Sequence, residues 1–155
     1  MQLRPLLAKF DAAAAFLQSP LLLVIRLYWG WSFAQTGWGK LMHLERTAGY
    51  FESLDIPMPK VNAVMAGGTE CVGGALLALG LFARPAAVPL IFTMLVAYWT
   101  ADREAFLAIG SNPDKFFAAD PFLFLYASLI VLAFGPGKLS LDALLGRGGA
   151  AANKG

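Results

Sequence analysis

The sequence has very few residues of the kinds that hold metals or form redox centres. Its 155 residues include one cysteine, Cys71, and one histidine, His43. A haem held by two histidines, an iron–sulfur cluster and an internal disulfide all need more of these side chains than the chain has. The motifs CxxC, HExxH, GxGxxG and Walker A are also absent. We therefore expect no haem, iron–sulfur or metal site. Any reaction must use groups supplied by another molecule or proceed without such a cofactor.

Charged residues are scarce as well. They make up 14% of the chain against 58% hydrophobic residues, and the mean hydropathy is +0.62, whereas ordinary globular chains are roughly 25% charged and 45–50% apolar. A soluble protein of 16.6 kDa could not bury so much apolar surface. The net charge of +2 is spread along the chain without a basic run, so we expect no nucleic-acid binding. The composition predicts a polytopic membrane protein that is embedded in a lipid bilayer.

Four apolar stretches are candidates for membrane-spanning helices, each of which needs about 20 residues. They are residues 20–42, 61–82, 85–101 and a last stretch that begins at Asp120-Pro121 and ends at Gly135-Pro136-Gly137. The second and third are separated by almost no loop, so they must form an antiparallel hairpin. The fourth is short, and it either begins nearer Phe116 or is tucked against its neighbours. The predicted fold class is an all-α membrane protein, a bundle of four transmembrane helices.

The two ends of the chain differ from this membrane domain, which we place at residues 20–145. Residues 1–19 contain Arg4, Lys9 and Asp11 and lack the uninterrupted apolar core of a cleavable signal peptide. We predict that they form an interfacial helix or tail. Residues 140–145 are predicted to be a short helix on the membrane surface, and residues 146–155 a flexible tail.

The distribution of basic residues predicts the orientation. The side that holds both termini and the turn at Arg84 carries slightly more Lys and Arg than the opposite side. Because basic residues are retained in the cytoplasm, both termini are predicted to be cytoplasmic.

Two charged residues fall inside the predicted spans, and each costs about 2.5–3.5 kcal/mol or more at the bilayer centre. Arg26 lies about 9 Å from the inner end of the first span, and Glu70 lies about 16 Å from the inner end of the second. An extended arginine side chain can reach across this difference in depth. The sequence therefore predicts a buried Arg26–Glu70 pair. One interpretation is that the pair only fixes the register of the bundle; the other is that it handles a ligand or a proton, which would make both residues catalytic.

Small residues surround both charges and favour close contact between the first two spans. One face of the first span, at steps of three and four residues, carries Arg26, Gly30, Phe33, Gly37 and Lys40. The residues around Glu70 on the second span are Ala63, Ala66, Gly67, Gly73, Gly74 and Leu77. Cys71 is interpreted as a small buried hydrophobe.

Aromatic and basic residues suggest a ligand pocket. Trp29, Phe33 and Tyr126 are predicted at the depth of the two charges, where they could wall a quinone ring whose carbonyls accept hydrogen bonds from Arg26; ordinary helix packing is the alternative. Lys40, at the outer end of the first span, is either a lysine that reaches to the interface or a polar lip of the pocket.

Three segments resemble the DoxX/DoxD family of small four-span bacterial and archaeal membrane proteins. They are RLYWGWSFAQTGWGKL in the first span, GGTECVGGALLALGLFARPAA from the second into the third, and GPGKLSLD after the fourth. The resemblance covers about residues 26–142. It implies a bacterial inner (plasma) membrane, a quinone cofactor and a redox partner protein, as in thiosulfate:quinone oxidoreductase or in oxidative-stress assemblies.

Two functions follow as hypotheses. In the first, the chain is a non-autonomous membrane subunit of a quinone-linked oxidoreductase, with a quinone bound near Arg26 and Glu70. In the second, it is a non-enzymatic scaffold or assembly factor for a partner protein. A homo-oligomer is compatible with both. Small-solute transport is less attractive because no inverted repeat is visible.

Overall fold

The computed structural model describes residues 3–146, and this part of the chain is helical, without strands. The helices are α1 (Leu3–Met42), α2 (Leu44–Ser53), α3 (Pro59–Leu79), α4 (Ala83–Thr100), α5 (Arg103–Leu107), the 3₁₀ helix η1 (Ala108–Gly110), α6 (Pro113–Ala118), α7 (Pro121–Phe134) and α8 (Leu141–Leu144). The predicted all-α class is confirmed. Of the predicted tail, residues 147–155 lie outside the described residues.

Two described helices, α1 and α3, are long and apolar enough by themselves to cross a membrane. A third span is obtained if α4 and residues 103–110 count as one bent span, with a bend of 93°. Helix α7 begins at Pro121 and ends before Gly135, so its 14 residues measure only about 21 Å, less than a bilayer core of about 30 Å. Helices therefore occupy all four predicted stretches, but their lengths support two or three spans.

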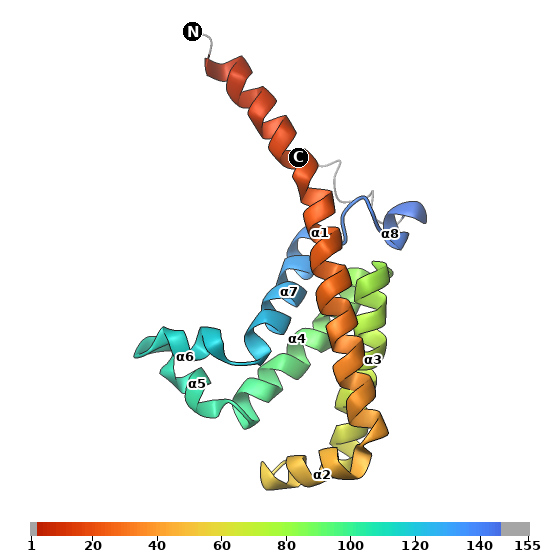
Figure 1. The fold of residues 1–155 in the computed structure, drawn as a ribbon, viewed down its shortest axis with the longest axis vertical. Coiled ribbons are helices and arrows are strands. Elements are labelled where there is room, and N and C mark those ends of the chain that lie inside the picture. Colours follow the sequence, from red (N-terminus) through yellow and green to blue (C-terminus); the bar gives the residue numbers. More distant parts are fainter. Residues whose placement is uncertain (1–2, 147–155) are drawn as a thin grey trace.

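Helix α1 is longer than expected. Its 40 residues run without a break through Pro20, over about 60 Å, and its first half projects away from the other helices (Figure 1). The first span is predicted to begin at residue 20, but the helix runs through this position. The Ser19 hydroxyl accepts a hydrogen bond from the backbone N–H of Lys138 at 3.2 Å. The alanines at 12–15 are strong helix formers and continue the helix.

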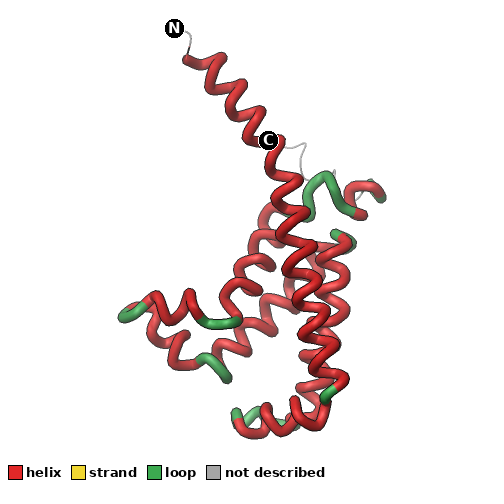
Figure 2. The backbone as a smooth tube through the Cα atoms, viewed as in Figure 1, coloured by secondary structure: helices red, strands yellow, loops and turns green. Residues whose placement is uncertain are grey.

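The first two apolar helices lie along each other (Figure 2), and glycines form their contact, as the sequence predicts. A Cβ atom on Gly37 of α1 would lie 2.3 Å from the backbone nitrogen of Cys71. A Cβ atom on Gly74 of α3 would lie 2.6 Å from the backbone nitrogen of Ala34. Backbone therefore meets backbone at this interface, and no larger residue fits at either position.

Helices α3 and α4 form the predicted hairpin. The chain reverses at Gly80, which has φ +65° and donates its N–H to the carbonyl of Leu77 at 3.1 Å. Helix α7 packs on α4, and their shared core contains Leu90, Tyr98 and Val131. At the opposite end from the hairpin turn, α2 lies across the end of α3, and α5, η1 and α6 form a short arm on the other side (Figure 1).

Candidate functional site

Arg26 is fully buried near the hairpin turn between α3 and α4. Its guanidinium donates to the carbonyl of Ala78, at 3.3 Å, and to the carbonyl of Leu139, in the segment after α7. Gly80 lies so close that a Cβ atom there would be 2.0 Å from Nη1 of Arg26. Arg26 therefore joins three parts of the chain through backbone carbonyls.

Asp142 completes this junction from the C-terminal side. Its carboxylate accepts hydrogen bonds from the backbone N–H groups of Phe82, at 2.9 Å, and Ala83, at 3.0 Å, and so satisfies donors at the start of α4. The N–H of Asp142 donates to the carbonyl of Gly80 at 2.9 Å. The predicted short helix is present as α8, capped by the Ser140 hydroxyl, but both Ser140 and Asp142 are buried in the protein.

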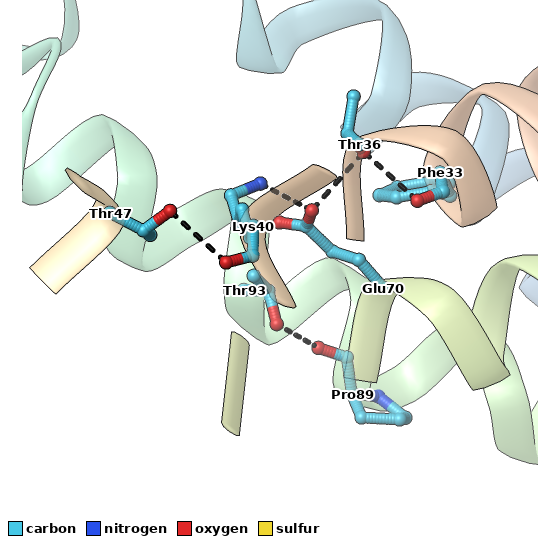
Figure 3. Close-up of polar contacts among 7 residues, drawn as sticks. All are labelled: Phe33, Thr36, Lys40, Thr47, Glu70, Pro89 and Thr93. Atoms are coloured by element: carbon cyan, nitrogen blue, oxygen red, sulfur yellow. Dashed lines mark hydrogen bonds and ion pairs between the residues drawn. The ribbon is translucent and has the colours of Figure 1, made fainter. Parts of the chain in front are cut away.

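Glu70 has different partners from the predicted one. Its Oε2 accepts a hydrogen bond from Thr36 at 3.1 Å and forms an ion pair with Lys40 (Figure 3). The Arg26–Glu70 pair is thus not formed. On α3, the carbonyl that Arg26 contacts is eight residues beyond Glu70, or about 12 Å along the helix axis, and Lys40 is closer on the same face of α1.

The Lys40–Glu70 pair lies in a cavity of about 520 Å³. Most of the cavity wall is apolar, and its aromatic and methionine residues are Phe33, Tyr50, Phe51, Met65, Phe92, Met94 and Phe124. The polar residues of the wall are Thr36, Lys40, Asn62, Thr69, Glu70, Thr93, Thr100, Asp102 and Asp120. The cavity therefore runs from Glu70, in the middle of α3, toward the loops after α2 and α4.

Helices α3 and α4 diverge from their turn, and the cavity occupies the space between them on the side away from that turn. Met65 of α3 and Phe92 of α4 both line the cavity, and both are more than 60% exposed in the isolated chain. The cavity is therefore open at the surface of the isolated chain between these two helices.

The structure separates the predicted site residues into two groups. Phe33, Lys40 and Glu70 line the cavity, whereas Arg26 does not. Trp29 packs edge-on against Phe124, with ring centroids 5.0 Å apart, and does not line the cavity.

Tyr126 also lies away from the cavity. It is exposed and stacks on Phe122. Cys71 is half-buried rather than fully buried, and residues 3–146 contain no group of three or more His, Cys, Asp or Glu residues that could hold a metal ion.

Several cavity residues were missed by the sequence analysis. Thr36 could have been found, because it lies one helical turn before Lys40 on the face that meets α3. Phe124, Asp102 and Asp120 could not, because their position depends on the angle between α4 and α3. Lys40, for which the sequence leaves open a lysine that reaches to the interface or a polar lip of the pocket, lines the cavity and forms an ion pair with Glu70.

Long apolar helices that pack through glycines and enclose a buried ion pair define an integral membrane protein. The chain belongs to the DoxX family: the DoxX family model matches residues 21–103, more than half of the chain. The resemblance inferred from the sequence is thereby confirmed.

Relatives of similar length support this assignment. The chain is 34% identical to the inner membrane protein YphA of Escherichia coli K12, over 86% of this chain and 94% of the relative. It is 35% identical to the uncharacterized membrane protein Rv3486 of Mycobacterium tuberculosis, over 83% of each chain. An uncharacterized protein of Haemophilus influenzae is 28% identical, over 80% of this chain and 82% of the relative. No solved structure matches the chain.

Proposed function

We propose that this protein is a multi-pass protein of the bacterial inner membrane that binds a quinone in the α3–α4 cavity. In this proposal it serves as the non-autonomous membrane subunit of a quinone-linked redox system, and a redox partner protein exchanges electrons with the bound carrier. The observation that carries the proposal is the cavity itself, a largely apolar pocket with the Lys40–Glu70 ion pair in its wall.

The size and lining of the cavity suit a quinone. Its volume of about 520 Å³ falls within the roughly 300–1,000 Å³ that is usual for small-molecule sites, which are mainly apolar with a few polar groups. Phe33 and Phe124 lie edge-to-face, with centroids 4.6 Å apart, and offer an aromatic wall beside Glu70. The exposed side at Met65 and Phe92 gives a hydrophobic tail a path to the lipid.

The connections at Arg26 support four crossings with both termini on one side of the membrane, which we propose from the distribution of basic residues to be the cytoplasm. The end of α3, the start of α4 and the segment after α7 meet at Arg26 and Asp142. Helix α7 must therefore run back toward the end from which α4 started. We therefore propose that α7, although short, is the fourth crossing. The Leu139–Asp142 segment covers one end of α7, and the α5–α6 arm covers the other.

The role predicted for Arg26 in orienting a quinone stays a prediction. We propose instead that Lys40 and Glu70 contact the head group and that Arg26 holds the helices together. Trp29 supports the cavity from behind, through Phe124.

The quinone content of the purified protein tests the proposal. Ala97 lines the cavity, and Ala75 is an exposed residue of α3 outside it, so Ala97→Phe fills the cavity while Ala75→Phe adds the same ring on the lipid side. The protein is purified in mild detergent, and the bound quinone is extracted and quantified. We expect near-stoichiometric quinone, counted as the sum of its oxidised and reduced forms, in the unmodified chain and in Ala75→Phe, and little in Ala97→Phe. Absence of quinone from the unmodified chain, or equal amounts in both variants, would contradict the proposal.

A second candidate function is a membrane scaffold or assembly factor. This function is favoured because Arg26 donates its hydrogen bonds to backbone carbonyls. One of the two buried charges therefore stabilises the fold instead of binding a ligand. Mass spectrometry of co-purifying proteins distinguishes the two functions. A soluble redox protein supports the oxidoreductase subunit, and a non-redox client without quinone supports the scaffold.

A further inference from the structure

The two oxygens of the Glu70 carboxylate are used unequally. Oε2 accepts from both Thr36 and Lys40, whereas Oε1 accepts no hydrogen bond from any residue between 3 and 146. Glu70 lines the cavity, so Oε1 is an acceptor available to a ligand. Within residues 3–146, Nε of Arg26 is the one fully buried side-chain nitrogen or oxygen without a partner, so Oε1 of Glu70 is open to the cavity. A ligand that donates to Oε1 gains a hydrogen bond to a charged group.

Lys40 offers the complementary group beside it. An ammonium carries three N–H donors, and one of them is directed at Oε2 of Glu70. The Lys40 side chain is 29% exposed and also lines the cavity, so its other donors are accessible. The wall of the cavity thus presents an acceptor and a donor side by side.

We infer that this site binds a hydroxyl group, and that its preferred ligand is the reduced form of the lipid-soluble carrier, a quinol, rather than the quinone. This inference rests on the proposed quinone-binding function and specifies the redox form. A hydroxyl donates and accepts through one oxygen, so it can donate to Oε1 of Glu70 while accepting from Lys40. A quinone carbonyl accepts only, and it would place its lone pairs against the Glu70 carboxylate.

The rest of the cavity favours a ring over an aliphatic alcohol. The edge-to-face rings of Phe33 and Phe124 stand beside the ion pair, and aromatic ligands gain from offset or edge contacts with such walls. An aliphatic alcohol shares the hydroxyl but gains no such contact. Both molecules are therefore needed in the test.

The experiment compares two redox forms of one probe. The full chain is placed in phosphatidylcholine nanodiscs under argon, and binding of decylubiquinol and decylubiquinone is measured by equilibrium filtration, with empty nanodiscs subtracted. A hydrogen bond to a charged group corresponds to about ten-fold in affinity, so the quinol is expected to bind about ten-fold more tightly than the quinone. 1-Dodecanol is expected to compete weakly.

The outcomes separate the inference from the proposed function. Equal or tighter binding of the quinone would overturn the quinol preference and leave quinone binding standing. Absence of binding by both forms would overturn the proposed function as well. Competition by 1-dodecanol as strong as that by unlabelled quinol would overturn the assignment of a ring-bearing ligand.

A variant pair adds a second readout. Glu70→Gln replaces Oε1 or Oε2 by an amide NH₂, which donates to a carbonyl, so the ratio of quinol to quinone affinity should fall to about one or below. Glu45→Gln makes the same chemical change at a side chain that is 81% exposed and outside the cavity, and it should keep the ratio of the unmodified chain. An unchanged ratio in a folded Glu70→Gln protein would contradict the role of Oε1. The comparison in the unmodified chain does not depend on this variant.

Discussion

The ammonium of Lys40 contacts Oε2 of Glu70 across the interface between α1 and α3. The Glu70 side chain is 3% exposed and the Lys40 side chain 29% exposed, so the carboxylate depends on this contact more than the ammonium does. The same pair that faces the cavity therefore also holds two membrane helices together.

Removal of Lys40 should destabilise the protein because it leaves a buried carboxylate with Thr36 as its remaining donor. We expect Lys40→Met to lower the free energy of unfolding by roughly 1–3 kcal/mol, less than for a fully buried pair because Lys40 is partly exposed. The double variant Lys40→Met/Glu70→Gln should recover at least half of this loss, because it removes the orphaned charge. Unfolding by titration with sodium dodecyl sulfate measures both values.

A surface ion pair provides the control for this cycle. Lys60 pairs with Glu45, and their side chains are 60% and 81% exposed, so Lys60→Met should change stability by no more than about 0.5 kcal/mol. A loss in Lys60→Met as large as in Lys40→Met would show that charge removal in general, rather than burial of Glu70, is responsible.

The α1–α3 interface should not tolerate a methyl group at Gly37. A Cβ atom there would lie 2.3 Å from the backbone nitrogen of Cys71 and 2.5 Å from the carbonyl oxygen of Gly67, so the helices would have to separate. We expect Gly37→Ala to lower stability by about 2–3 kcal/mol, seen as a lower Tm in detergent.

Gly39 is the matched position for this test. It lies two residues further along α1, and a Cβ atom there would have no neighbour within 4 Å. Gly39→Ala should leave the Tm unchanged or raise it, because alanine favours a helix by about 0.5–1 kcal/mol over glycine. Equal Tm values in the two variants would refute the close backbone contact.

Arg26→Lys tests whether Arg26 holds the junction or handles the ligand. A lysine keeps the charge but cannot donate to the carbonyls of Ala78 and Leu139 with a planar fork. We expect stability to fall by about 1–3 kcal/mol and trypsin to cleave faster at the exposed Lys138, while the quinone content per folded molecule stays the same.

Arg84 offers the comparison for Arg26. It also donates to two carbonyls, those of Leu132 and Ala133, but in an exposed setting, so Arg84→Lys should cost less than Arg26→Lys. Loss of quinone from a stable Arg26→Lys protein would favour the ligand role predicted for Arg26 from the sequence.

The proposed four crossings predict which loops face outside. With Cys71 replaced by serine, single cysteines at Ser53 and Ser111 should react with a membrane-impermeant maleimide in intact cells whose outer membrane is permeabilised. A cysteine at Lys138 should react only after lysis. All three positions are exposed, so accessibility within the fold does not bias the comparison, and labelling at position 138 in intact cells would rule out the proposed orientation.

The helices and their closest contact could be predicted from the sequence because they depend on local rules. Pro121 and Gly135 delimit α7 as expected, and the alternative start near Phe116 is not observed, since Ala119 is extended and separates α6 from α7. The small residues around Gly37 and Gly74 predicted the α1–α3 contact correctly.

The pairing of the buried charges could not be predicted in this way. Depth along a helix placed Arg26 within reach of Glu70, but it gave no information on the carbonyls of Ala78 and Leu139, which come from the hairpin turn and from a segment 113 residues away. Backbone carbonyls can accept the hydrogen bonds of an arginine in place of a carboxylate. The cavity could not be predicted from the sequence for a related reason, because it depends on the angle between α3 and α4.

The junction at Arg26 has a consequence for the biosynthesis of the protein. The carbonyl of Leu139 and the carboxylate of Asp142 are supplied by almost the last residues of the described chain. While the ribosome is still making this segment, Arg26 already lies in the first span without one of its two acceptors, and the start of α4 is uncapped. The spans can thus be inserted one after another, but the contacts between them are complete only after residues 139–142 have been made, and a nascent chain truncated before Leu139 would be a substrate for membrane proteolysis.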